Sequence, residues 1–352
     1  MIKKILHLIS LLLFLAGCKP AVSILSPIAG TTFDLEATVP FIGSAVDLQD
    51  GSLADDSLVW KSNIDGEIET GNTFSKDDLS EGTHTITLAA TNSQGETGTD
   101  AITITIGESA NMVLIPAGEF EMGCQDDECK DDELPVHAVY LDALYIDKYE
   151  VTNRQYASFL NTYGNNCDEY SCYGEEVPYG KIEQASGIWT VESGYEDHPA
   201  NYVTWHGASE YCTSLGKRLP TEAECEKTSR GGLEGKKYPW GDTEPDCTYA
   251  NAYGCLDDTT PVGSYSPNDY GLYDMAGNVW EWASDWYDFY YYEYSPYSNP
   301  TGPDSGSLFY KVLRGGGWNS NSAHLRSAQR DHYYPGYHYW AGIGFRCVKD
   351  TQ

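Results

Sequence analysis

Cysteine divides this chain into two unlike parts, because nine of its ten cysteines lie between residues 124 and 347 and none lies between residues 19 and 123. The length of 352 residues also exceeds what one hydrophobic core usually serves, so two domains are expected. Three cysteine pairs are close in sequence: Cys124 with Cys129, Cys167 with Cys172, and Cys247 with Cys255. In an exported protein such spacing favours disulfides. A zinc cluster is the alternative, but no Cys-x-x-Cys or paired His spacing supports it. With nine cysteines, one stays unpaired.

The first twenty residues, MIKKILHLISLLLFLAGCKP, have the composition of an export signal. Two lysines precede an apolar run that is too short for a comfortable membrane span. Leu-Ala-Gly-Cys resembles the bacterial lipobox, which implies a lipoprotein signal peptide over residues 1–17, an acylated Cys18 and a linker over 18–23. The alternative is an ordinary signal peptide cut nearby, with Cys18 incidental. The lipobox resemblance implies the membrane as a partner and a place in the bacterial cell envelope, lipid-anchored at the outer-membrane surface.

The charge of the chain excludes one class of partner. A formal net charge of −32 repels the phosphates of nucleic acids, so no nucleic acid partner is expected. Hydrophobic residues make up 41% of the chain and Trp and Tyr are plentiful, which indicates a folded protein rather than an acidic disordered one.

Residues 24–108 carry the pattern of an all-β domain. The segments DSLVWKSNIDGEIETGNTF and GTHTITLAATNSQGETGTDAITITI alternate Thr, Ile and Val with polar residues and bend at Asp-Gly and Asn-Ser-Gln-Gly. We therefore expect an immunoglobulin-like β-sandwich of about seven strands. Its expected role is to hold the next domain away from the membrane, and an independent binding role is the alternative.

The composition changes near residue 110, where Trp, Tyr, Gly and Cys become frequent. Two segments predict helices. In EVTNRQYASFLNTYG, Thr152 or Asn153 is a candidate cap, and Tyr156, Phe159 and Leu160 form an apolar stripe. The second segment, TWHGASEYCTSLG, ends at a glycine.

Six motifs in this second part occur in a fixed order: MVLIPAGEFEMG, DKYEVTNRQYASFL, GKRLPTEAECEK, YPWGD, PVGSYSPNDYGLYDMAGNVWEWASDWY, and LRGGGWN followed by GIGFRC. Together they resemble the formylglycine-generating-enzyme-like (sulfatase-modifying-factor) domain, a variant of the C-type lectin fold. The resemblance covers residues 110–350 and implies an α+β fold class for the chain, a C-type-lectin-like domain preceded by the β-sandwich. It is far less specific for activity, because functional sites are grafted onto folds.

The resemblance also bears on catalysis. Catalytic members of the family hold copper with two cysteines shortly after the Gly-Gly motif, and the corresponding positions here are Ser320 and Leu325. Neither side chain supplies the soft ligand that Cu(I) prefers, so no enzymatic activity and no catalytic cofactor are expected. The family pattern further implies a disulfide between Cys212 and Cys347 and leaves Cys225 as the unpaired thiol.

One motif suggests a structural metal. In GNVWEW, the side chains of Asn278 and Glu281 and the carbonyl of Val279 are hard oxygen donors suited to calcium, and family members bind calcium around this motif. The alternative is that Asn278 and Glu281 satisfy backbone groups in a Trp-rich core.

The run RGGGWNSNSAHLRSAQRDHYYPGYHYWAGIGFR, residues 314–346, has an unusual interior. Its interior has thirteen variable-looking positions, and every one holds a residue that an Asn codon encodes before or after substitution of its adenines: Asn319, Ser320, Asn321, Ser322, His324, Asp331, His332, Tyr333, Tyr334, Gly336, Tyr337, His338 and Tyr339. The residues between them have the character of a fixed frame: Ala323, Leu325, Arg326, Ser327, Ala328, Arg330 and Pro335. This pattern resembles the variable region of proteins diversified by a retroelement that mutates adenines. Alternatively, the Tyr-rich composition has no special role in this chain, since residues 285–300 are also rich in Tyr.

The palette of Tyr, Asn, Ser and His matches the one that antibody loops use for contact. We therefore expect a surface-displayed lipoprotein that binds a protein or another cell-surface ligand through the thirteen positions. Two alternatives remain open at this stage. One is an oxidase of the formylglycine-generating kind with altered chemistry, and the other is a structural envelope lipoprotein with a fixed partner.

Overall fold

The computed structural model describes residues 19–33, 38–107, 111–174, 180–305, 309–336 and 342–351. The chain divides into two compact units, Met1–Asn111 and Met112–Gln352. The predicted signal peptide and Cys18 lie outside the described residues. Within the described ranges, the helices are too short or too polar to cross a bilayer.

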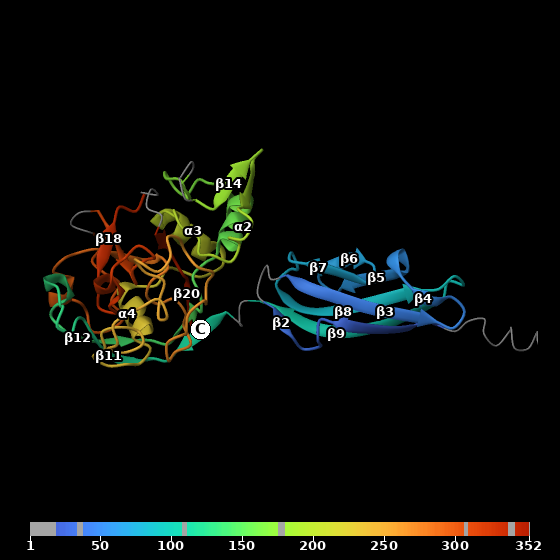
Figure 1. Ribbon diagram of the computed structural model, residues 1–352, viewed down its shortest axis with the longest axis horizontal. Coiled ribbons are helices and arrows are strands. Elements are labelled where there is room, and N and C mark those ends of the chain that lie inside the picture. The colour runs from blue at the N-terminus through green and yellow to red at the C-terminus, as the bar shows by residue number, and fades with distance from the viewer. Residues whose placement is uncertain are drawn as a thin grey trace, which may run out of the picture. The chain divides into compact units, whose positions relative to one another are not determined.

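The first unit consists of two β-sheets (Figure 1). Its strands are β1 (Ala21–Ser26), β2 (Thr32–Phe33), β3 (Val39–Asp47), β4 (Gly51–Leu53), β5 (Leu58–Ser62), β6 (Gly66–Thr70), β7 (Thr73–Lys76), β8 (Gly82–Thr91) and β9 (Thr97–Ile106). One sheet has the order β2-β9-β8-β5-β6, and in the other β3 pairs with β1, β4 and β7. The hairpin between β8 and β9 turns at the Asn-Ser-Gln-Gly segment, as the sequence predicted.

The two sheets of this unit share one core. Strand β3 alternates buried and exposed residues along most of its length, which is the pattern of a strand with one face against a core. Phe41 of β3 meets the ring of Trp60 from the other sheet edge to face, with 5.3 Å between ring centroids, and stacks on Phe74 at 4.8 Å. Phe41 and Phe74 lie on paired strands of one sheet and Trp60 lies on the other, so this aromatic cluster joins the two sheets.

The second unit combines short sheets with three α-helices among its described residues (Figure 1). Its strands are β10 (Met112–Ile115), β11 (Gly118–Met122), β12 (His137–Leu141), β13 (Leu144–Asp147), β14 (Ile182–Ala185), β15 (Ile188–Val191), β16 (Trp280–Trp286), β17 (Lys311–Arg314), β18 (Asp331–Tyr333), β19 (Ile343–Gly344) and β20 (Val348–Asp350). The sheet with the order β18-β17-β16-β19 carries both ends of the 314–346 run. The run begins at Arg314, the last residue of β17, and β19 lies near its end and pairs in parallel with β16. In between, β18 pairs with β17.

Threonine caps fix the starts of all three helices, α2 (Asn153–Tyr163), α3 (Trp205–Ser214) and α4 (Glu222–Arg230). Thr152 is the cap of α2 and Gln155 completes a capping box, so the expected helix begins at the first of its two candidate caps. Thr204 caps α3 by accepting from the Gly207 amide.

The third helix, α4, was not predicted from apolar periodicity. All nine of its residues are buried, including Glu222, Glu226 and Arg230, so no single face of the helix is apolar. The signal that reveals it is the capping box Thr221-x-x-Glu224 within the motif GKRLPTEAECEK. Helix α4 packs against β11, β16 and β17, which places its charged side chains at the centre of the unit.

Disulfides join four cysteine pairs in the described chain: Cys124–Cys129, Cys167–Cys172, Cys212–Cys347 and Cys247–Cys255. Cys225 is a free, buried thiol. These are the pairs and the unpaired residue that spacing and resemblance indicated. The Cys212–Cys347 bond lies within an aromatic core in which Phe345 contacts the rings of Tyr156 and Tyr211, and it ties α3 to the C-terminal strand.

Removing the Cys212–Cys347 bond should destabilise the second unit strongly, because it closes a separation of 135 residues. For Cys212→Ala with Cys347→Ala we expect the free energy of unfolding in urea to fall by about 2–5 kcal/mol. The matched control is Cys247→Ala with Cys255→Ala, which opens a separation of 8 residues and should cost less in the chain-entropy model. Equal losses from the two double variants would contradict this assignment.

Candidate ligand-binding surface

The predicted contact positions and the residues between them differ in exposure. Nine of the predicted contact positions are exposed or half-buried, and together they are called the patch: Asn319, Asn321, Ser322, His324, Asp331, His332, Tyr333, Tyr334 and Gly336. Buried frame residues are Leu325, Arg326, Ser327, Ala328, Arg330 and Pro335, while Ala323 is half-buried. The predicted contact residues Tyr337, His338 and Tyr339 lie outside the described residues. The described part of the run thus separates into a surface set and an interior set.

Ser320 departs from the expected exposure. Its side chain is buried, and its hydroxyl accepts a hydrogen bond from the Gly317 amide at 2.9 Å. Its backbone carbonyl accepts from the Tyr253 amide, also at 2.9 Å. Ser320 therefore stabilises the turn after the glycines, and the prediction that it presents its side chain to a ligand is wrong for this conformation.

Backbone pairing holds the second half of the patch. Strand β18 pairs with β17 so that Asp331 faces Leu313, His332 faces Val312 and Tyr333 faces Lys311. All four residues of β17 are buried, so the patch residues of β18 rest on a rigid strand. The Gly316 backbone, at a positive φ of 75°, passes the His324 carbonyl so closely that a Cβ would lie 2.9 Å from that oxygen. This approach explains why glycine precedes the first patch residues.

Arginines of the run enter the interior and pair with carboxylates. Arg330 binds both oxygens of Glu222, with Nε–Oε1 at 2.7 Å and Nη2–Oε2 at 2.9 Å. Arg326 binds Glu133 in the same two-bond manner, at 2.6 and 2.9 Å. Bidentate pairs of this kind fix orientation as well as charge.

Arg314 completes the network at the start of the run. Its Nη2 atom lies 2.8 Å from Glu226 Oε2, and Arg230 approaches the other oxygen of the same carboxylate. Burial works against ionisation of Glu226, but the charges of Arg230 and Arg314 outweigh it and lower its pKa. The Arg–Glu network of Arg314, Arg326, Arg330, Glu133, Glu222 and Glu226 therefore holds the frame through charge-assisted hydrogen bonds.

Two patch histidines lie on aromatic side chains. His332 stacks on Tyr287 with ring centroids 4.0 Å apart and also contacts Tyr310. His324 lies 5.7 Å from the ring of Trp280. Burial lowers the pKa of both imidazoles, which favours their neutral form. The contact of Tyr287 with His332 was not expected, because the 285–300 run resembled ordinary framework sequence.

The loop closed by Cys167–Cys172 reaches the far end of the patch. Tyr170 of this loop stacks on His206 with ring centroids 4.4 Å apart and planes 15° apart. A hydrogen bond with Tyr334 raises the pKa of the Tyr170 phenol. A Cβ on Gly336 would collide with the Tyr170 ring, so the identity of residue 336 controls where Tyr170 lies.

The positions that correspond to the family's copper ligands have structural surroundings. The Ser320 hydroxyl is engaged by the Gly317 amide, and Leu325 packs in a small core with Tyr238 and Ala250. Neither residue is a thiolate.

The predicted calcium ligands have protein partners. The Asn278 amide oxygen accepts from the Thr260 amide at 2.9 Å, and its nitrogen donates to Glu150. Glu281 receives two bonds from Arg346, at 2.7 and 2.8 Å. The side-chain oxygens thus face donors rather than an open cation position, and for Val279 the structure shows its amide 3.3 Å from Glu150. Asn278 and Glu281 thus have the protein partners of the alternative interpretation, and calcium binding by the three residues stays a prediction.

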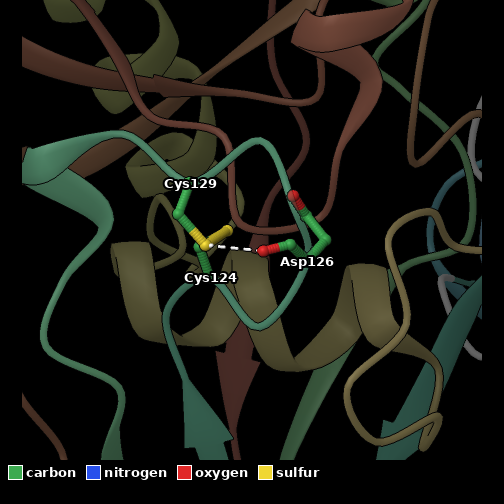
Figure 2. Close-up of side chains that lie close together, drawn as sticks. All are labelled: Cys124, Asp126 and Cys129. Carbon is green, nitrogen blue, oxygen red and sulfur yellow. Dashed lines mark hydrogen bonds between the residues drawn. A yellow bond between two sulfur atoms is a disulfide. The ribbon is translucent and has the colours of Figure 1, made fainter.

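Figure 2 shows a second grouping of ligand-type side chains, Cys124, Asp126 and Cys129. Both sulfur atoms belong to one disulfide, so neither is available as a metal-binding thiolate. The Cys129 sulfur lies 3.1 Å from the Asp126 carbonyl oxygen, while the Asp126 carboxylate lies 3.3 Å from Arg326 Nη1. This loop is therefore an anchor of the frame.

Together the three helices, the short sheets and the paired termini of the run define a C-type-lectin-like domain of the formylglycine-generating-enzyme type. Residues 101–351 match the family described as sulfatase-modifying factor enzyme 1-like domain, and the chain belongs to this family. The predicted α+β class and C-type-lectin-like fold are thereby confirmed.

Relatives of several kinds share this domain. A serine/threonine-protein kinase pkn1 of Chlamydia pneumoniae is 45% identical over 243 residues, covering 68% of this chain and 38% of that protein. This chain therefore matches well under half of that relative. The formylglycine-generating enzyme of Streptomyces coelicolor is 34% identical and is covered to 89%, again across 68% of this chain. The structure of Treponema denticola variable protein 1 aligns with a TM-score of 0.52 at 24% identity, covering 67% of this chain and 94% of that one, which shows a shared fold.

Substitutions in the frame and in the patch should differ sharply in cost. Arg330→Met leaves Glu222 buried without its bidentate partner, so we expect a loss of about 3–5 kcal/mol in the free energy of unfolding. Asn319→Tyr and Ser322→Asn change exposed side chains and should stay within about 0.5 kcal/mol. Urea unfolding of the three variants measures the difference, and a patch substitution as costly as Arg330→Met would contradict it.

A side chain at residue 336 should move Tyr170 away from its contact with His206. Burial lowers the pKa of His206, so in Gly336→Asn the newly exposed imidazole should titrate closer to its ordinary value of 6.5. NMR titration of the histidine ring protons measures this upward shift. Ser322→Asn is the matched control and should leave His206 unchanged. An unaltered titration of His206 in Gly336→Asn would refute the coupling.

Proposed function

We propose that residues 112–352 bind a protein or another cell-surface ligand through the patch, and that the patch is a variable surface. The observation that carries this proposal is the match between residue type and exposure. Nine of the ten described positions of the predicted contact set are exposed or half-buried. Six of the seven frame residues between them are buried, Ser327 among them, and Arg326 and Arg330 are tied by ion pairs. Residues that can change are thus at the surface, and residues that hold the backbone are inside.

Diversification by adenine-directed mutagenesis accounts for the residue types. Substituting adenines in an Asn codon yields Asp, His, Tyr, Ser or Gly, the types found in the patch beside Asn itself. Tyr and His supply large contact area with polar tips, and Ser and Asn supply adaptable hydrogen bonds. The likeness in fold to Treponema denticola variable protein 1 supports the use of this scaffold for variation.

We further propose that the chain is a lipoprotein of the bacterial cell envelope, anchored through Cys18 and displayed at the outer-membrane surface. The Leu-Ala-Gly-Cys segment supports this placement. The β-sandwich of the first unit then serves as an immunoglobulin-like spacer between the membrane and the binding domain.

The second candidate is an oxidase, favoured by the 34% identity to the Streptomyces coelicolor formylglycine-generating enzyme. The turn-bonded Ser320 and the buried Leu325 favour binding over catalysis, because neither supplies a thiolate for copper. Stoichiometric Cu(I) binding by the purified chain, measured by competition with a colorimetric chelator, would reverse this preference. Our proposal predicts no such binding.

Sequencing codons 310–350 across descendants of one cell tests the proposal directly. We expect substitutions at adenines of the patch codons, with the codons of Arg326 and Arg330 unchanged. A near-copy of the region beside a reverse transcriptase gene is also expected. Invariant patch codons with no such copy would contradict variation and favour a structural envelope protein with one fixed partner.

A further inference from the structure

We propose that Tyr170 and Tyr253 form a constant aromatic rim, one residue at each end of the patch, that contacts the ligand whatever residues the other patch positions carry while residue 336 is glycine. This inference rests on the proposed function and adds to it a set of contact residues outside the variable run. The occupant to which it commits is a folded protein of net positive charge.

The first rim residue lies beside the N-terminal half of the patch. Tyr253 belongs to the loop closed by Cys247–Cys255, and its amide donates to the Ser320 carbonyl at 2.9 Å. Because Ser320 lies between Asn319 and Asn321, this bond places the Tyr253 backbone next to two exposed patch residues. The Tyr253 side chain is 78% exposed, and the neighbouring Leu256 is 52% exposed. A large aromatic residue so exposed, on a loop held by a disulfide, is available for contact with a partner.

The second rim residue lies beside the C-terminal half. Tyr170 belongs to the loop closed by Cys167–Cys172, and its ring lies so close to Gly336 of the patch that a Cβ there would collide with it. Its ring is supported from behind by His206. The loop itself is held by backbone bonds, since the Cys172 carbonyl accepts from the Tyr156 hydroxyl and from the Thr204 amide. Tyr170 is therefore presented by a rigid support, which lowers the entropy cost of contact.

Constant aromatic residues solve a problem that a variable surface creates. Patch residues that change from one variant to the next cannot all be strong contacts, and in protein interfaces a few residues, often Tyr, supply most of the binding energy. Neither rim codon lies in the 314–346 run, so the rim persists while the patch changes. The rim then contributes affinity to every complex, and the patch decides which ligand is bound.

Charge decides the kind of partner. The chain carries a net charge of −32, so association with another strongly acidic protein is opposed and association with a basic one is favoured. Acidic side chains also lie at the patch itself: Asp331 is in it, and Asp168 and Glu169 are exposed beside Tyr170.

The test uses a library of the chain from residue 19 onward, displayed on yeast, with Gly336 kept and the other patch codons replaced by the products of adenine substitution. Selection against lysozyme, a folded basic protein, at about 150 mM salt supplies several independent binders. In each binder Tyr253→Ala and Tyr170→Ala are introduced, and the Kd for lysozyme is measured. Tyr145→Ala is the matched control, because Tyr145 is an exposed tyrosine on β13, in a different sheet from the patch. Tyr170→Phe keeps the ring on His206 and guards against a local folding defect, which the display level and protease resistance also report.

We expect each rim alanine to weaken binding about tenfold or more in most binders, with Tyr145→Ala within about twofold and Tyr170→Phe close to the parent. If binders arise and the rim alanines leave the Kd within about twofold, the rim is refuted while the proposed function stands. If the library yields no binder that depends on the patch, both the proposed function and the rim are refuted.

Discussion

The binding domain depends on the buried ion pairs between the arginines of the 314–346 run and the carboxylates of α4 and residues 131–133. Arg314, Arg326 and Arg330 each bury their guanidinium almost completely, and each lies within 3 Å of a carboxylate oxygen of Glu226, Glu133 or Glu222. A buried charge is tolerated only when it is paired, so each arginine is confined to the position where it meets its carboxylate. Because the arginines belong to the run, this pairing also fixes the backbone that carries the patch. Because α4 supplies two of the three carboxylates, its complete burial is what allows the run to be irregular and yet ordered.

This arrangement separates folding from recognition along a single segment. The frame residues satisfy their hydrogen bonds inward, through the Arg–Glu network and the β17–β18 pairing. The fold therefore depends little on the side chains that face outward, apart from Asn321, whose side chain caps residues 322–325. The disulfide loops extend the same logic beyond the run. Asp126 of the Cys124–Cys129 loop contacts Arg326. The other two small loops bring Tyr170 and Tyr253 to the edges of the patch. A surface of this design can exchange Tyr, Asn, Ser, Asp and His without loss of the domain, which is the property that a diversified binder needs.

Much of this could be predicted from the sequence, and the exceptions have physical causes. Short-range signals sufficed for Thr152 as a cap, for the close cysteine pairs, and for the exposure of Asn319 and Tyr334. Helix α4 was not predicted, because its charged residues are buried on all sides and the usual contrast between an apolar and a polar face is missing. The burial of Ser320 was not predicted, because it depends on the hydrogen bond that the Ser320 hydroxyl accepts from the Gly317 amide. The contacts of Tyr170 and Tyr253 join residues far apart in the chain, and no local pattern encodes them.

The most direct test of the account is a tolerance map of residues 314–336. Every codon of the segment is saturated in the displayed chain, and folded variants are recovered by resistance to protease. The account predicts that Arg314, Arg326, Arg330 and the glycines before the patch accept almost no substitution, whereas Asn319, Ser322 and Tyr334 accept most residue types. If patch and frame positions proved equally intolerant, or equally permissive, the proposed division between a fixed interior and a variable surface would be wrong.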